Sequence, residues 1–152
     1  MTTIPQDLKS KSMSTLNIPV AVVCPDQESV LSSVKEGNEI NLINPILIGN
    51  KSLIEQTANK ISLDIKKFNI VETKNNQEAA TVACQLANEN KIKVIIKGNL
   101  HTDILMRFYL KKEFALLEGK RLSHIWHMTA PKLKKPLFIT DGALNVLPRV
   151  EI

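Results

Sequence analysis

Four short apolar runs alternate with amphipathic segments along most of the chain, and this alternation limits the fold more than any other feature of the sequence. The runs are Ile18–Cys24, Pro45–Gly49, Phe68–Glu72 and Val94–Lys97. Each run has the length of a strand, is bounded by turn residues, and indicates a buried strand. Strands that alternate with helices favour a parallel sheet joined by right-handed crossovers. We therefore expect an α/β fold, with a mostly parallel sheet and helices on both faces.

The segments between these runs predict helices from their spacing and capping residues. Asp26 is expected to cap the first helix, and Gly37-Asn38 to end it. Asn50 is expected to cap the second helix. The clearest helix follows Asn75-Asn76, because its apolar residues recur at the spacing of one helical face. These residues are Ala79, Val82, Ala83, Leu86 and Ala87.

The two ends of the chain differ from this pattern. Residues 1–17 are polar and are expected to form a flexible lead-in with one helical turn. Near the other end, Leu122–Ala130 and Pro136–Thr140 indicate two strands joined by a loop at Pro131–Lys135. No helix of useful length separates them, so they are expected to be antiparallel or to lie in another layer. We take 18–152 as one domain, because 152 residues suit a single core.

Composition excludes several classes of function. The net charge is +5, but the lysines are scattered, and aromatic residues make up only 4% of the chain. Few bases could stack on such a surface, so nucleic-acid binding is not favoured. No apolar stretch is long enough to cross a membrane and no signal peptide is visible, which predicts a cytoplasmic protein. Cys24 and Cys84 are expected to be buried free thiols.

The loop after the fourth strand is the best candidate for a binding site. Ligands of open α/β sheets bind beyond the carboxyl ends of the strands, which here are followed by four loops. The fourth loop contains Lys97, Gly98 and Thr102 and opens a helix. Glycine permits close approach of the backbone, and a helix N-terminus with a nearby lysine suits an anion. The alternative is an ordinary connection between a strand and a helix, without a binding role, in which Asn99 or Thr102 is the N-cap.

The remaining polar residues give weaker signals. His124 and His127 are expected on opposite faces of one strand, so the sequence predicts no metal site. Asp141 follows the last strand and is a candidate for orienting a substrate or for acid–base catalysis. Asp141-Gly142 is equally a common turn signal. No glycine-rich nucleotide motif is present.

Several segments, in order, resemble the phosphate acetyl/butyryltransferase family. The run Lys97–Met106 is similar to its KG-x-LHTD-x-LM segment, and Arg121–Met128 is similar to RxSHxxxM. Lys135–Asn145 with Pro148 resembles KPLFITDxAxNxxP. The resemblance covers roughly residues 18 to 152 and is strongest to the butyryltransferase-like branch. That branch also forms the acyltransferase half of some bifunctional enoyl-CoA hydratase/phosphate acetyltransferase chains.

The resemblance implies an enzyme that exchanges an acyl group between coenzyme A and phosphate, with coenzyme A as a substrate and no cofactor. It implies two α/β lobes, the first like that of isocitrate and isopropylmalate dehydrogenases, a cleft between the lobes, and a homodimer. The substrate- or phosphate-binding residues that it implies are Lys97, Gly98, His101, Thr102, Asp103 and Ser123. Where the acetyltransferase branch has an arginine, this chain has Met106 beside Arg107.

Family members are about twice as long as this chain, and their Ser/Asp/Arg catalytic residues lie in the part that this sequence does not contain. We therefore expect an N-terminal portion of a phosphate acyltransferase, truncated at its C-terminus. It would pair with a complementary C-terminal fragment or form a homo-oligomer. The alternative is a non-catalytic module that binds coenzyme A, phosphate or a partner chain. A nucleic-acid binder is a third and weaker reading of the positive charge.

Overall fold

The computed structural model divides into two units, which are described separately. One unit is Gln6–Leu116, and the other contains Leu117–Ile152. The described residues are 6–14, 16–117, 119, 122–129 and 135–142. None of the described helices is long and apolar enough to span a membrane.

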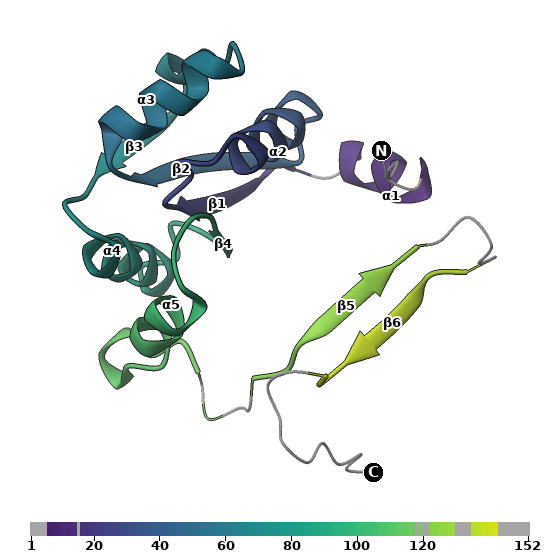
Figure 1. The fold of residues 1–152 in the computed structure, drawn as a ribbon. Coiled ribbons are helices and arrows are strands. Elements are labelled where there is room, and N and C mark those ends of the chain that lie inside the picture. The colour runs from purple at the N-terminus through teal and green to yellow at the C-terminus, as the bar shows by residue number, and fades with distance from the viewer. Residues whose placement is uncertain (1–5, 15, 118, 120–121, 130–134, 143–152) are drawn as a thin grey trace. The chain divides into compact units, whose positions relative to one another are not determined.

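A parallel sheet of four strands forms the centre of the first unit, as the sequence predicts (Figure 1). The strands are β1 (Ile18–Val23), β2 (Ile43–Gly49), β3 (Asn69–Glu72) and β4 (Val94–Lys97). Their order across the sheet is β3-β2-β1-β4. Val20, Ala21, Val22 and Val23 of β1 are all buried, because β1 pairs on both edges and is covered on both faces. This explains why the run is apolar without alternation.

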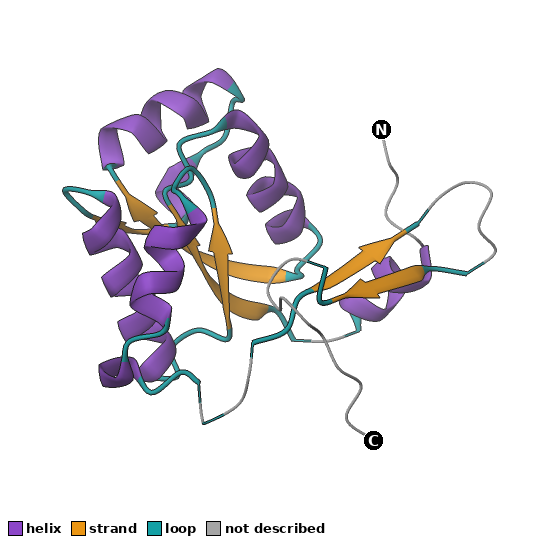
Figure 2. Cartoon of the chain, turned by 60° about the horizontal axis from the view of Figure 1, so that its bottom comes forward, coloured by secondary structure: helices purple, strands orange, loops and turns teal. Residues whose placement is uncertain are grey.

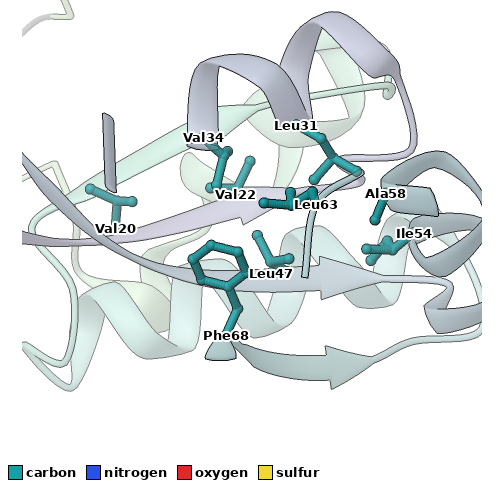
Figure 3. Packing of buried hydrophobic residues seen from close by; sticks show 9 residues of the cluster. All are labelled: Val20, Val22, Leu31, Val34, Leu47, Ile54, Ala58, Leu63 and Phe68. Carbon is teal, nitrogen blue, oxygen red and sulfur yellow. The ribbon is translucent and has the colours of Figure 1, made fainter. Parts of the chain in front are cut away.

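The helices cover both faces of the sheet (Figure 2). α2 (Glu28–Glu39) and α3 (Lys51–Lys60) pack on one face, where Leu31 and Ile54 join Leu47 in the core shown in Figure 3. α4 (Asn76–Asn88) and α5 (Thr102–Tyr109) pack on the other face. The chain steps from β1 to β2 to β3 and then back across to β4. Right-handed crossovers in opposite directions place α2 and α3 on one face and α4 on the other, and α5, which follows β4, packs beside α4.

The observed helix boundaries agree only in part with those predicted from the sequence. Asn50 caps α3 as predicted, since its side chain accepts a hydrogen bond from the Leu53 N–H. Asp26 does not cap α2; the N-cap is Gln27, whose side chain makes no capping bond. α2 also continues through Gly37 to Glu39, past the predicted stop. The chain leaves β1 through a left-handed Cys24 (φ 52°), and Asp26 falls one residue before the helix.

Three short helices complete the first unit. α1 (Gln6–Met13) lies in the predicted lead-in, η1 (Ile65–Lys67) precedes β3, and η2 (Lys112–Phe114) follows α5; η1 and η2 are 3-10 helices. Phe114 of η2 is buried.

The second unit contains an antiparallel hairpin, one of the two arrangements expected from the sequence. Its strands are β5 (Ile125–Met128) and β6 (Leu137–Thr140), paired from Ile125–Thr140 to Met128–Leu137. Most of the predicted loop at Pro131–Lys135 lies outside the described residues, as do Asn145 and Pro148.

Candidate functional site

The carboxyl ends of the four parallel strands meet at one edge of the sheet. Val23 of β1 lies opposite Ile48 on one side and Lys97 on the other, and Gly49 lies opposite Glu72. The strand order reverses between β1 and β4, so the connections after these strands leave toward opposite faces. Such a switch point is where open α/β sheets bind ligands. The loop predicted from the sequence, after β4, lies at this point.

Gly98 brings the loop after β4 into contact with the loop after β1. Its N–H donates to the Val23 carbonyl at 2.8 Å, and the Asn99 N–H donates to the Cys24 carbonyl at 2.7 Å. A Cβ at Gly98 would lie 2.4 Å from the Cys24 oxygen and 2.8 Å from the Val23 oxygen. No side chain fits there, so glycine is required by the approach of two backbones.

A pocket of about 380 Å³ opens beside this contact. We call it the switch-point pocket; residues 97–101 line it together with Gln27 and Asn76. The Gln27 Nε2 donates to the Asn99 Oδ1 at 3.3 Å, which joins the two loops a second time. The pocket is therefore polar and held by both loops.

Lys97 supplies positive charge at the pocket but also holds the loop. Its Nζ donates to the carbonyls of Gly98 at 3.2 Å and Leu100 at 3.0 Å. An ammonium group has three donors, so one remains for an anion.

The N-terminus of α5 adds backbone donors. His101 is the N-cap, with no side-chain capping bond, rather than Asn99 or Thr102. The N–H groups of Thr102 and Asp103, at the first two helical positions, have no carbonyl partner within the helix. The Asp103 carboxylate lies 3.8 Å from the Arg107 guanidinium, and both side chains are exposed. Arg107 therefore pairs within α5.

Cys24 follows β1 directly and is a buried thiol. Burial, and secondarily the nearby Asp26 carboxylate, raise the pKa of its thiol to about 11. The neutral thiol donates to the Asn76 Oδ1 at 3.4 Å. Cys84 is likewise buried, and burial raises its pKa to about 11 despite the opposing effect of Lys111. Both cysteines are free, buried thiols, as the sequence predicts.

The other predicted site residues belong to the hairpin unit. Ser123 is exposed and precedes β5. Asp141 follows β6 at φ 54°, and its N–H donates to the His124 carbonyl at 2.8 Å. The His124 ring contacts Trp126, and the His127 ring contacts Phe138 across the hairpin. Among the residues that the structure describes, no group of histidine, cysteine and acidic side chains could hold a metal ion.

Sequence reasoning missed Gln27 and Asn76 as pocket residues. From the sequence alone, Asn76 is placed only before a predicted helix, and nothing is assigned to Gln27. Both sit at helix starts that follow strands of the parallel sheet. This position after a strand is the one sequence signal for a role in the pocket, because it places a residue at the carboxyl edge of the sheet, where ligands bind.

Comparison with known proteins identifies relatives. Residues 8–110 match the family described as "Phosphate acetyl/butaryl transferase". A phosphate acetyltransferase of Rickettsia felis is 37% identical over 135 residues, which are 88% of this chain and 38% of that protein. A phosphate butyryltransferase of Clostridium beijerinckii is 34% identical over 138 residues, 91% of this chain and 45% of that protein.

Solved structures share the fold. A branched-chain phosphotransacylase from Enterococcus faecalis V583 superposes with a TM-score of 0.69 at 22% identity, covering 87% of this chain and 45% of that one. The EutD phosphotransacetylase from Staphylococcus aureus gives a TM-score of 0.66 at 16% identity, covering 88% of this chain and 49% of that one. The matched regions thus span less than half the length of each of these relatives.

Proposed function

The chain belongs to the phosphate acetyl/butyryltransferase family, and we propose from this that it supplies one lobe of an enzyme that exchanges an acyl group between coenzyme A and inorganic phosphate. The family match over residues 8–110 carries the proposal. Relatives named phosphate acetyltransferase and phosphate butyryltransferase align with most of the chain. No cofactor enters this reaction, in which coenzyme A is a substrate.

The switch-point pocket would receive the phosphoryl group. In the reaction, the sulfur of coenzyme A attacks the carbonyl carbon of an acyl phosphate, the C–O bond breaks, and phosphate leaves as the thiol loses its proton. The departing phosphate gains negative charge, which fixed donors stabilise. The third Lys97 donor and the first N–H groups of α5 are suited to this role. Cys24 is poorly suited to carry an acyl group, because burial raises the pKa of its thiol to about 11.

We propose that the chain requires a second polypeptide segment for turnover. Lys97 is the one cation that lines the switch-point pocket among the described residues, and two of its three donors already bind carbonyls. The matched relatives extend well beyond the aligned region. A complementary C-terminal fragment, or another copy of the chain, would supply the remaining groups. Without it, the lobe would bind phosphate or coenzyme A without catalysis.

An acyl-transfer assay tests this proposal. The purified chain, with acetyl or butyryl phosphate and coenzyme A, is expected to form no thioester above background. Adding the C-terminal part of a related phosphate butyryltransferase should restore formation. Turnover near about 1 s⁻¹ by the chain alone would contradict the need for a second segment.

Binding measurements distinguish a lobe of an acyltransferase from a non-catalytic module that binds phosphate or coenzyme A. Lys97→Met should weaken binding of acetyl phosphate, while Lys66→Met, a change at an exposed lysine outside the pocket, should not. Binding without turnover in the complemented sample would favour the non-catalytic module. No binding of phosphate, acyl phosphate or coenzyme A in any sample would refute both roles.

A further inference from the structure

A second pocket, of about 160 Å³, lies at the same edge of the sheet, among the loops that follow β1, β2 and β3. We call it the asparagine pocket. Its polar lining includes Asp26, Asn50, Thr73, Lys74, Asn75 and Asn76. Asn76 lines both pockets, but the asparagine pocket contains none of residues 97–101. The family resemblance gave no role to this set of residues.

The three asparagines present their amide nitrogens as free donors. The Asn50 Oδ1 accepts from the Leu53 N–H at 3.0 Å, and the Asn75 Oδ1 accepts from the Glu78 N–H at 2.9 Å. The Asn76 Oδ1 accepts from the Cys24 thiol. Each acceptor oxygen is thereby occupied, and each side chain keeps two N–H donors. Within the described part of the chain, nothing accepts a hydrogen bond from these nitrogens.

Thr73 adds a hydroxyl donor to the pocket. Only 5% of this residue is exposed, and it lines the pocket. Its N–H donates to the Gly49 carbonyl at 3.0 Å, but its hydroxyl makes no hydrogen bond to any described residue. The residue is therefore largely enclosed by the protein while its hydroxyl is left to bond with whatever occupies the pocket.

Positive potential surrounds these donors. The N-terminal residues of α3 and α4, helices of ten and thirteen residues, both line the pocket. Each helix start carries partial positive charge and N–H groups without helical partners. Lys74 adds an ammonium group that forms no ion pair among the described residues. The pocket is therefore suited to an anion.

Asp26 brings a negative charge to this otherwise positive pocket, and its carboxylate limits which anions can bind there. It is the one acidic residue in the described lining, and its Oδ1 is buried without a hydrogen-bond partner. A carboxylate would repel a fully deprotonated anion but would accept a hydrogen bond from an anion that carries a proton. Monohydrogen phosphate has one such P–OH group and three oxygens that accept. Sulfate has the same charge and shape but no proton.

We propose that the asparagine pocket binds monohydrogen phosphate, with the Asp26 carboxylate accepting a hydrogen bond from the P–OH group while Thr73, the asparagine amides and the helix N-termini donate to the other oxygens. The asparagine pocket shares only Asn76 with the described lining of the switch-point pocket, and the proposal does not depend on acyl transfer. The asparagine pocket would hold phosphate on the β2–β3 side of the sheet edge.

Heteronuclear NMR of the isotope-labelled full chain tests the site directly. At mildly alkaline pH, potassium phosphate should shift the amide signals of residues 50–52 and 73–77. Potassium sulfate at equal concentration should bind at least about tenfold more weakly, the difference expected for one hydrogen bond to a charged group. This comparison needs no variant, so it does not depend on how a substitution affects folding.

Substitutions then test which side chains of the asparagine pocket contact the phosphate. Thr73→Val keeps the shape of the side chain and should weaken phosphate binding about tenfold or more. Asp26→Asn should remove the preference for phosphate over sulfate. Thr102→Val, at the N-terminus of α5, should leave the shifts at residues 73–77 unchanged.

Two results would overturn the inference. One is equal binding of phosphate and sulfate by the unaltered chain. The other is phosphate-dependent shifts that are absent or confined to residues 97–103. Shifts confined to residues 97–103 would still agree with the proposed function, so the two proposals fail separately.

Discussion

Replacing Gly98 by alanine tests the contact between the loops after β1 and β4 on which the switch-point pocket depends. The added Cβ would lie 2.4 Å from the Cys24 oxygen, 2.8 Å from the Val23 oxygen and 2.9 Å from the Cys24 carbonyl carbon. All three neighbours are backbone atoms, which no side-chain rotation can move. One loop must therefore shift away from the other.

The expected loss of stability follows from this geometry. Overpacking at a rigid site costs typically about 1–3 kcal/mol. The shift also strains two hydrogen bonds, Gly98 N–H to Val23 and Asn99 N–H to Cys24, each of which contributes roughly 1 kcal/mol. We expect Gly98→Ala to lower the free energy of unfolding by about 2–4 kcal/mol. The cost is steric, since the φ of Gly98 is not in the left-handed region.

Urea unfolding of the full chain, followed by circular dichroism, measures this loss. Gly37→Ala is the matched control in the same unit, because its Cβ would meet only the Ile43 side chain, at 3.0 Å and 3.1 Å. Alanine is the better helix former by up to about 1 kcal/mol, so this variant should change stability little or increase it. Gly142→Ala, with nothing within 4 Å, should be neutral. If Gly98→Ala is no less stable than Gly37→Ala, the inferred locking of the two loops is wrong.

Four further outcomes are expected. Asn75→Ala should lower the free energy of unfolding by about 1 kcal/mol in the same urea assay, because it removes the cap of α4. Cys24 and Cys84 should react with thiol reagents far more slowly in the folded chain than in urea. Because folding raises their pKa values from 9.0 to about 11, their contribution to stability is full below pH 9.0 and declines as the pH rises toward 11. Urea titrations across this range should show a decline that Cys84→Ala reduces. Trp126, 57% exposed, should be readily quenched by acrylamide; a protected indole would show that the hairpin is covered.

Features with a local cause were predictable from the sequence. The apolar run of β1 and the limits of β4 follow from composition and turn residues, and the structure places β4 at Val94–Lys97 as predicted. The apolar stripe of α4 follows from its spacing, and Ala79 and Ala83 are fully buried. Neither required knowledge of a distant residue, because period and capping are properties of a short segment.

Asp26 shows where local reasoning fails. Aspartate is among the favoured N-cap residues, so its place before Val30 suggested a cap. In the structure, the Asp26 carbonyl accepts a hydrogen bond from the Thr57 hydroxyl of α3 at 3.1 Å, and its side chain lines the asparagine pocket. Contacts with a different helix and with the pocket fix its position. A capping preference worth roughly 1 kcal/mol does not override such packing.

The candidate site depends both on local sequence and on contacts between distant residues. The loop that contains it could be predicted from local sequence, whereas the contacts that hold this loop could not. The strand–glycine–helix pattern at Lys97–Thr102 predicts an anion site after β4, and the family resemblance indicates the same loop. Neither revealed that Gly98 is required by the carbonyl of Cys24, a residue of another strand connection. The side chains of His101 and Thr102 are exposed, so we expect their substitution to leave the backbone in place. Substitution of Gly98 therefore tests how the pocket is built, whereas substitution of His101 or Thr102 tests only what the pocket binds.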